Sequence, residues 1–206
     1  MNIIIKPSTS KGISYREYID LINNLVVLNQ TTGDEQSAER IGFTKLNASR
    51  MRRLDKTIIL SDSALTTIKE IAKKQTWLVL LESWCADAAQ TLPILNKIAE
   101  SSPLINLKII FRDDNKELMD LVLTNGTRSI PKILLLDESG NVMTTWGPRS
   151  KVASQMVVDY KKEHGKIDDF FKESLQVWYN KDKGKAIIDE FIELALLELE
   201  EHGKSN

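Results

Sequence analysis

One stretch decides the fold, TWLVLLESWCADAAQTLP, residues 76–93. Its first part, from Thr76 to Glu82, is short and continuously apolar, as a buried parallel strand is. Trp84 and Cys85 follow, and a helix begins there that we expect to run to about Glu100. Cys85 therefore stands at a strand-to-helix junction.

Outward from this stretch, helices and strands alternate. A helix begins at Ser61, and the order over residues 60–164 is α-β-α-β-α-β-β-α. The further strands are predicted at 107–111, 132–136 and 142–146, and the last helix at 150–165. The five residues at 137–141 are too few for anything but an antiparallel hairpin, so the hairpin adds to a parallel βαβ unit. These residues predict an α/β domain with a mixed sheet.

Helices are predicted on both sides of this domain. Ser14 and Glu17 form a capping box at the start of one helix, and a second runs over about 35–54, although Gly42 weakens it. Two more helices are expected beyond residue 165, over about 167–178 and 187–199. We therefore divide the chain into a helical N-terminal extension (1–59), a core domain (60–164) and a C-terminal helical extension (165–206) packed on the core.

Three arginines in the second of these helices, Arg50, Arg52 and Arg53, form a cluster of positive charge. Such a cluster could bind an anion, but it is more typical of a solvated helix face. We therefore predict a solvated face here.

The composition excludes several classes of function. Among 206 residues there are 28 Lys and Arg, 29 Asp and Glu, and a net charge of −1, which gives no field to attract nucleic acid or an anionic membrane. A single Cys and two distant His residues (His164 and His202) predict no disulfide and no zinc or iron–sulfur site. With no phosphate-binding glycine loop we expect no cofactor. No signal-peptide pattern and no apolar run of about 20 residues is present, so we expect a soluble, cytoplasmic protein.

The position of Cys85 has chemical consequences. A helix N-terminus presents unpaired N–H groups and about half a positive charge, and both favour a thiolate. Monothiol chemistry at Cys85 would require these groups to lower its pKa, whereas a cysteine in mid-strand would be inert. Pro93 should kink the helix that follows. Ile130 and Pro131 lead into the third strand, where an X-Pro bond can be cis.

This combination of motifs resembles the thioredoxin superfamily. Three segments, residues 83–90, 125–132 and 146–149, resemble more narrowly the bacterial thioredoxin-like proteins that carry helical extensions at both ends. The resemblance implies a thioredoxin-like fold, with a mixed central sheet in a three-layer α/β/α arrangement and added N- and C-terminal helices. It also implies that Cys85 is the catalytic residue, and that Ile130 and Pro131 contact the substrate.

The sequence departs from the family at two positions. The second cysteine of the Cys-x-x-Cys motif is replaced by Ala88, and the buried Asp of many thioredoxins is replaced by Val79. Without a resolving thiol, a mixed disulfide has to wait for an external thiol. These two departures argue against efficient dithiol reduction.

The supporting residues each have two interpretations. Asp87 is either a helix-start acid that caps backbone N–H groups or a negative charge that raises the pKa of Cys85. Glu82 faces either the same cavity as the sulfur or solvent. Trp84 either lines a substrate groove or shields the sulfur as core packing.

Three functions follow from these residues. The first is monothiol thiol–disulfide exchange in cell redox homeostasis, on a protein or small-molecule disulfide, completed by a low-molecular-weight thiol such as glutathione or bacillithiol. In it the Ile130 backbone would align the substrate as an added strand. The second is a redox-inactive binding or adapter module, whose helices serve a partner or a homodimer. The third, a thiol peroxidase, is disfavoured because Glu82 stands where related peroxidases carry Thr.

Overall fold

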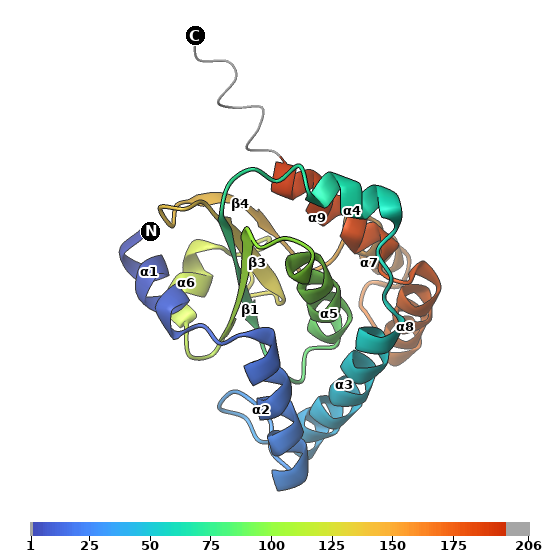
Figure 1. Ribbon diagram of the computed structural model, residues 1–206. Coiled ribbons are helices and arrows are strands. Elements are labelled where there is room, and N and C mark those ends of the chain that lie inside the picture. The colour runs from blue at the N-terminus through green and yellow to red at the C-terminus, as the bar shows by residue number, and fades with distance from the viewer. Residues whose placement is uncertain (1, 197–206) are drawn as a thin grey trace.

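The computed structural model describes residues 2–196, coloured in Figure 1. The helices are α1 (Asn2–Lys11), α2 (Tyr15–Leu28), α3 (Ala38–Thr57), α4 (Asp62–Ile68), α5 (Ala86–Glu100), α6 (Lys116–Leu121), α7 (Lys151–His164), α8 (Asp169–Asp182) and α9 (Lys185–Leu196). The strands are β1 (Gln75–Leu81), β2 (Ile105–Phe111), β3 (Lys132–Leu136) and β4 (Val142–Trp146).

The four strands form one mixed sheet in the order β2-β1-β3-β4. β1 pairs parallel with β2 and antiparallel with β3, and β3 and β4 form the antiparallel hairpin. Val79 lies opposite Ile109 on one side and Ile133 on the other. β1 is apolar along its length because it is central in the sheet and covered on both faces. The predicted mixed α/β sheet is confirmed.

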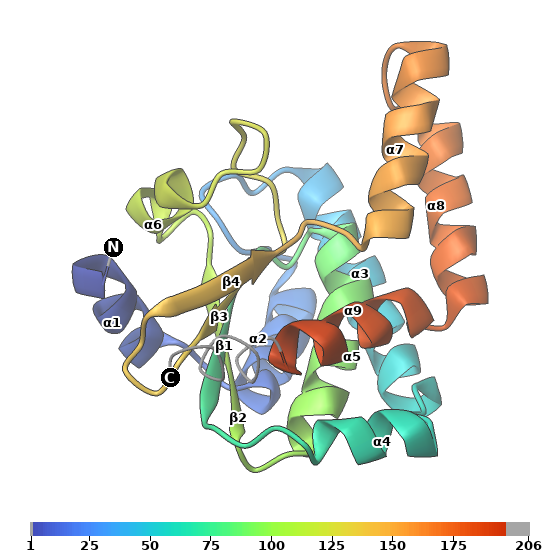
Figure 2. The same cartoon turned by 90° about the horizontal axis from the view of Figure 1, so that it is seen from above.

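Helices cover both faces of this sheet. α5 and α9 lie on one side and α1 and α6 on the other (Figures 1 and 2), which gives the predicted three layers. Phe191 of α9 packs between Trp77 and Trp146 of the sheet, with ring centroids 5.2 and 5.0 Å apart. The last described helix is therefore part of the main core. Leu199, the predicted end of this helix, lies outside the described residues. Within residues 2–196, no helix combines the length and apolarity needed to cross a membrane.

The N-terminal helices differ in how well the sequence predicts them. The capping box of α2 forms as expected, with the backbone N–H of Ser14 donating to Glu17 at 2.7 Å. α3 continues through Gly42, where an added Cβ would meet open space. α1 was not predicted, because it contains Pro7 and lacks a capping residue; burial of Ile5 in the core holds it in place.

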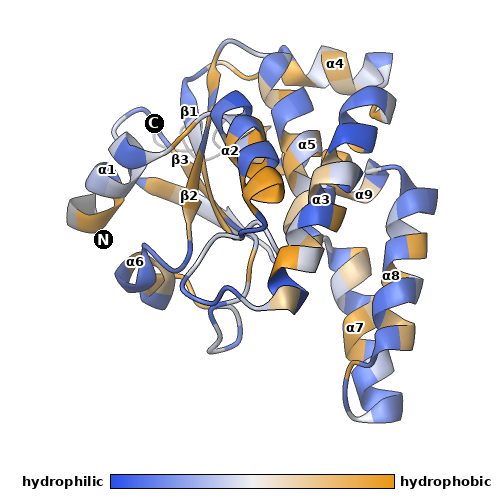
Figure 3. Ribbon diagram, turned by 90° about the horizontal axis from the view of Figure 1, so that it is seen from below, coloured by the Kyte–Doolittle hydropathy of each residue, from blue (hydrophilic) through white to orange (hydrophobic). Residues whose placement is uncertain are grey.

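α7 and α8 lie side by side and project from the body of the molecule (Figure 2). They are joined by aromatic packing, with Tyr160 stacked on Phe171 at 4.5 Å between centroids. Figure 3 shows hydrophobic residues concentrated along the strands and hydrophilic ones over much of α8. The hydroxyl of Tyr179 in α8 bonds to Asp87 in the first turn of α5, which links this helix pair to the body.

Candidate functional site

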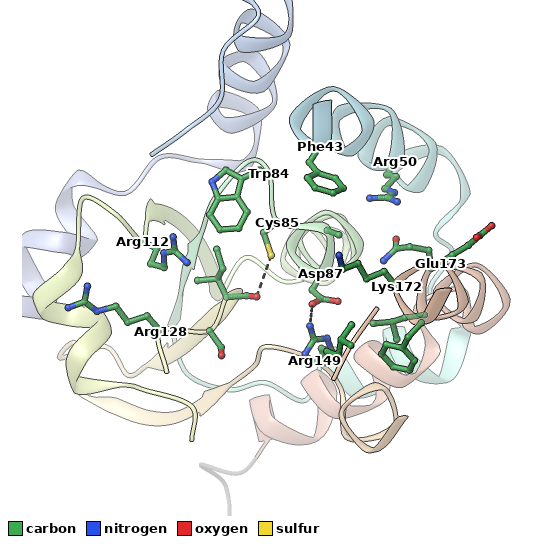
Figure 4. Close-up of a pocket in the computed structure, with 17 residues that line it drawn as sticks. Phe43, Arg50, Trp84, Cys85, Asp87, Arg112, Arg128, Arg149, Lys172 and Glu173 are labelled. Carbon is green, nitrogen blue, oxygen red and sulfur yellow. Dashed lines mark hydrogen bonds and ion pairs between the residues drawn. The ribbon is translucent and has the colours of Figure 1, made fainter. Parts of the chain in front are cut away.

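Cys85 is the N-cap residue of α5. Its thiol is buried and donates a hydrogen bond to the Ile130 carbonyl oxygen at 3.3 Å (Figure 4). The Ile130–Pro131 peptide bond is cis. The fold thus brings Cys85 and the Ile130–Pro131 loop together across 45 residues of sequence.

A cavity of about 440 Å³ adjoins the sulfur, and the side chains of Cys85 and Asp87 line it. Apolar side chains form much of the rest of its wall: Phe43, Trp84, Ile130, Ile167, Phe171 and Leu175. These residues come from α3, from the loops after β1 and before β3, and from α8 with the loop that precedes it. Helices from the N-terminal and C-terminal parts of the chain therefore help to form the cavity.

Trp84 is half-buried in the cavity wall between two arginines. The guanidinium groups of Arg40 and Arg112 lie 4.3 and 5.0 Å from its ring, in cation–π contact. Of its two interpretations, the structure places this side chain at a groove rather than inside the apolar core.

Asp87 is buried, and its carboxylate bonds to two residues distant in sequence. Arg149 forms an ion pair with it at 2.5 Å, and the Tyr179 hydroxyl donates to it at 3.0 Å. Both oxygens of Asp87 are thus engaged by side chains, and the negative charge lies beside the cavity that also contains Cys85 (Figure 4).

The segment Trp146-Gly147-Pro148-Arg149 delivers Arg149 to this carboxylate. Gly147 has φ +118°, and a Cβ at this position would overlap the Pro131 carbonyl oxygen. Glycine is required because the backbones of residues 147 and 131 approach so closely. The loop that carries Arg149 is therefore packed directly against the loop that faces the sulfur.

The pKa of Cys85 is raised, although the helix N-terminus favours a lowered one. Burial raises the pKa of the Cys85 thiol to about 12, and the negative charge of Asp87 adds to the rise. The backbone N–H groups of Ala88 and Asp87, together with Arg149, act in the opposite direction but do not compensate. The thiol is only 8% exposed, so loss of hydration outweighs the helix N-terminus. At neutral pH the sulfur is a protonated hydrogen-bond donor.

Glu82 fits neither of its two interpretations. It is fully buried, it does not line the cavity, and its carboxylate accepts a hydrogen bond from the Asp113 backbone N–H at 2.9 Å. Burial raises the pKa of Glu82. Its carboxylate holds the turn after β2 in place.

The family model described as "Thioredoxin" matches residues 33–164. The chain belongs to the thioredoxin superfamily. A protein of unknown function from Pseudomonas aeruginosa has a similar solved structure, with 19% identity and a TM-score of 0.59 over 90% of this chain and 93% of that one. An HIV epitope scaffold is similar at 19% identity and a TM-score of 0.55, over 88% and 97% of the two chains. A search of curated proteins finds no match. These likenesses show the fold.

The candidate site contains one sulfur, that of Cys85. Ala88, at the position of the second cysteine, is buried in the first turn of α5. Val79, at the position of the buried acid, packs as an apolar core residue. Asp87 and Arg149 are the charged side chains that act on the pKa of this thiol.

Sequence reasoning missed Arg50 as a site residue. The cluster was predicted to be a solvated face, which holds for Arg52 and Arg53, but Arg50 is half-buried and lines the cavity. The signal was available in the spacing, because Phe43, Asn47 and Arg50 follow one another at helical intervals on one face of α3. Tyr179 was missed because nothing local links it to Asp87, 92 residues away.

Proposed function

We propose that this protein carries out thiol–disulfide exchange through Cys85 as a single thiol. The observation that supports it is the Cys85 sulfur at the start of α5, 3.3 Å from the Ile130 carbonyl oxygen and beside a cavity of small-molecule size. A substrate disulfide, from a protein or a small molecule, would enter beside this sulfur. The Ile130 backbone, which lies against the sulfur, would align it, as in strand addition.

The reaction has two balanced steps. The Cys85 thiolate attacks one sulfur of the disulfide, so a new S–S bond forms while the old one breaks. The departing thiolate takes a proton equivalent to the one that Cys85 lost. A low-molecular-weight thiol such as glutathione or bacillithiol then attacks the substrate sulfur of the mixed disulfide, because Ala88 offers no sulfur to do so. A disulfide forms between that thiol and the substrate sulfur, the bond to Cys85 breaks, and Cys85 leaves as a thiolate that takes up the proton the attacking thiol lost.

The high pKa of Cys85 sets the rate of both steps. With a pKa of about 12, only about one molecule in 10⁵ carries the thiolate at neutral pH, so attack is slow. A thiolate of high pKa is also a poor leaving group, which makes the mixed disulfide long-lived. We therefore propose a protein that forms its adduct slowly and holds it, rather than a fast general reductant.

Intact-mass analysis after incubation with oxidised glutathione tests this proposal, with Cys85→Ala as the control. The wild type should gain one glutathione that reduced glutathione removes, and the variant should gain none. Absence of an adduct in the wild type after prolonged incubation at pH above about 9, where more thiolate is present, would overturn the proposal.

The raised pKa also favours a second candidate, a binding module without turnover. In that case the cavity would be kept for recognition of a partner or a second copy of the chain, and the thiol would act as a hydrogen-bond donor to Ile130. Cys85→Ser keeps a donor at this position. If cells that carry this variant behave as cells with the wild-type protein do, the binding module is favoured. If they behave as cells without the protein do, thiol–disulfide exchange is favoured.

A further inference from the structure

The cavity beside Cys85 has more positive than negative side chains. Its cationic residues are Arg50, Arg112, Arg128, Arg149 and Lys172, and its acidic ones are Asp87 and Glu173. Figure 4 shows Arg112 and Arg128 on one side of the cavity and Arg50 and Lys172 on the other. Five cationic side chains thus stand against two acidic ones along a largely apolar wall.

Four of these five cations are already paired with carboxylates. Arg149 is paired with Asp87, Arg112 with Asp113, Arg128 with Asp120 and Lys172 with Asp169. Their charges are therefore largely balanced within the protein.

Arg50 differs from the other four. Its guanidinium donates to the neutral side-chain amide of Asn47 at 2.9 Å, and in the described part of the chain it forms no ion pair. It is half-buried, and burial lowers its pKa, with the positive charge of Arg53 acting in the same direction and the negative charge of Asp87 opposing both. Both oxygens of Asp87 are bonded to Arg149 and Tyr179, so Arg50 has no carboxylate in direct contact among the described residues, and an anion in the cavity would supply one.

The apolar wall specifies the rest of the ligand. Phe43 precedes Arg50 by two turns on α3, and Phe171 and Leu175 lie on α8. A volume of about 440 Å³ lies in the range of small-molecule sites. In such surroundings an ion pair is stronger than in water. A hydrocarbon or aromatic part of the ligand adds to the binding free energy because its apolar surface is removed from water.

We infer that the cavity binds a small organic carboxylate with an apolar body, and that Arg50 pairs with the carboxylate. Where the ligand also contains a disulfide, its sulfur end faces Cys85, an orientation that rests on the proposed function. The inference narrows the substrate to a small anionic disulfide rather than an extended protein strand, because α3 and α8 wall the space beside the sulfur.

The binding clause is tested in a protein that cannot react. Cys85→Ala contains no thiol, because Cys85 is the chain's single Cys, so aromatic disulfides bind to it without exchange. Calorimetric titration would compare dithiobis-nitrobenzoate, which carries two carboxylates, with neutral dipyridyl disulfide. Adding Arg50→Gln should lower the affinity for the anionic probe by about tenfold or more and change the affinity for the neutral probe by no more than about twofold.

The matched control is Arg52→Gln, an exposed arginine on the same helix, which should change neither affinity. Equal losses in the Arg50 and Arg52 variants, equal losses for both probes, or no saturable binding of the anionic probe below about 10 mM would overturn the inference. If Arg50→Gln fails to fold, the inference is tested by the effect of salt on the affinity of Cys85→Ala for the two probes. Its affinity for the anionic probe alone should fall several-fold between about 20 and 500 mM salt, and salt-independent binding contradicts the inference.

The outcome is separable from that of the proposed function. Binding by Cys85→Ala together with no adduct in the wild type would reject exchange and keep the anion site. An adduct in the wild type, together with no effect of Arg50→Gln on binding of the anionic probe, would support exchange and reject the anion site.

Discussion

Two buried carboxylates lie close to Cys85 in sequence, Glu82 before it and Asp87 after it, and their surroundings differ. Glu82 accepts a backbone N–H from Asp113 and belongs to no ion pair within residues 2–196. Asp87 is bound by Arg149 and Tyr179 and lines the cavity. Glu82 is therefore a buried structural group. The carboxylate of Asp87, paired with Arg149 at the cavity wall, places a negative charge beside the sulfur, where it helps to hold the thiol protonated.

Substitution of two glycines, Gly147 and Gly33, should give the largest difference in stability between the two regions. An alanine at Gly147 would overlap the backbone oxygen of Pro131, whereas an alanine at Gly33 would meet the end of the Asp113 side chain rather than backbone. Both positions have positive φ. We expect Gly147→Ala to lower the free energy of unfolding by about 4 kcal/mol, from backbone strain and overpacking together, and Gly33→Ala by about 1–2 kcal/mol.

Equilibrium unfolding in urea measures both losses. Gly42→Ala is the matched control, since its Cβ would meet open space within a helix; it should be neutral or stabilising by up to about 1 kcal/mol. A Gly147→Ala loss no greater than that of Gly33→Ala would contradict the close packing of the two loops.

Removing Arg149 should have the next largest effect. Arg149→Ala leaves Asp87 as a buried carboxylate without its cation, and we expect a loss of about 3 kcal/mol of stability. Asp87→Asn in the same chain removes the stranded charge, so the double variant should lose less than the two single losses added together. A double-mutant cycle in urea measures this coupling, and strictly additive losses would show that the two side chains do not form a buried pair.

Replacing Glu82 should have the smallest effect, and that effect should depend on pH. The pKa of Glu82 is raised by burial, so the folded state holds the proton more tightly than the unfolded state does. Its contribution to stability is therefore complete below the unfolded pKa and is lost as pH rises through the folded one.

Glu82→Gln mimics the protonated acid at all pH values. Relative to the wild type, it should gain stability as pH rises from about 5 to about 8, and thermal unfolding across this range measures the gain. Asp62→Asn, at an exposed acid, serves as the control and should follow the wild type. A gain that shrinks with rising pH would contradict the raised pKa.

The elements that the sequence predicts well are those with local signals. The apolar run ending at Leu81, the capping box at Ser14 and the short loop at 137–141 determine strand, helix start and hairpin through nearby residues alone. The approach of Cys85 to Ile130 was also predicted, through the resemblance to a family of known fold.

What the sequence could not predict depends on distant contacts. The pKa of Cys85 is set by how completely the fold excludes water, which no motif records. The spacing of Phe43, Asn47 and Arg50 marks one face of α3, but only the packing of α3 against α5 shows that this face borders the cavity, and the partners of Asp87 come from loops and helices much later in the chain. α1 lacks local signals and is held by burial of Ile5.

The rate at which Cys85 forms a mixed disulfide, followed by intact mass as a function of pH, tests the central claim most directly. A buried thiol with a pKa of about 12 should react with oxidised glutathione about tenfold faster for each unit between about pH 7 and pH 9, without a plateau, and only at Cys85. A plateau below about pH 8 would contradict the protonated, desolvated sulfur, and the absence of any adduct over the whole range would contradict thiol–disulfide exchange.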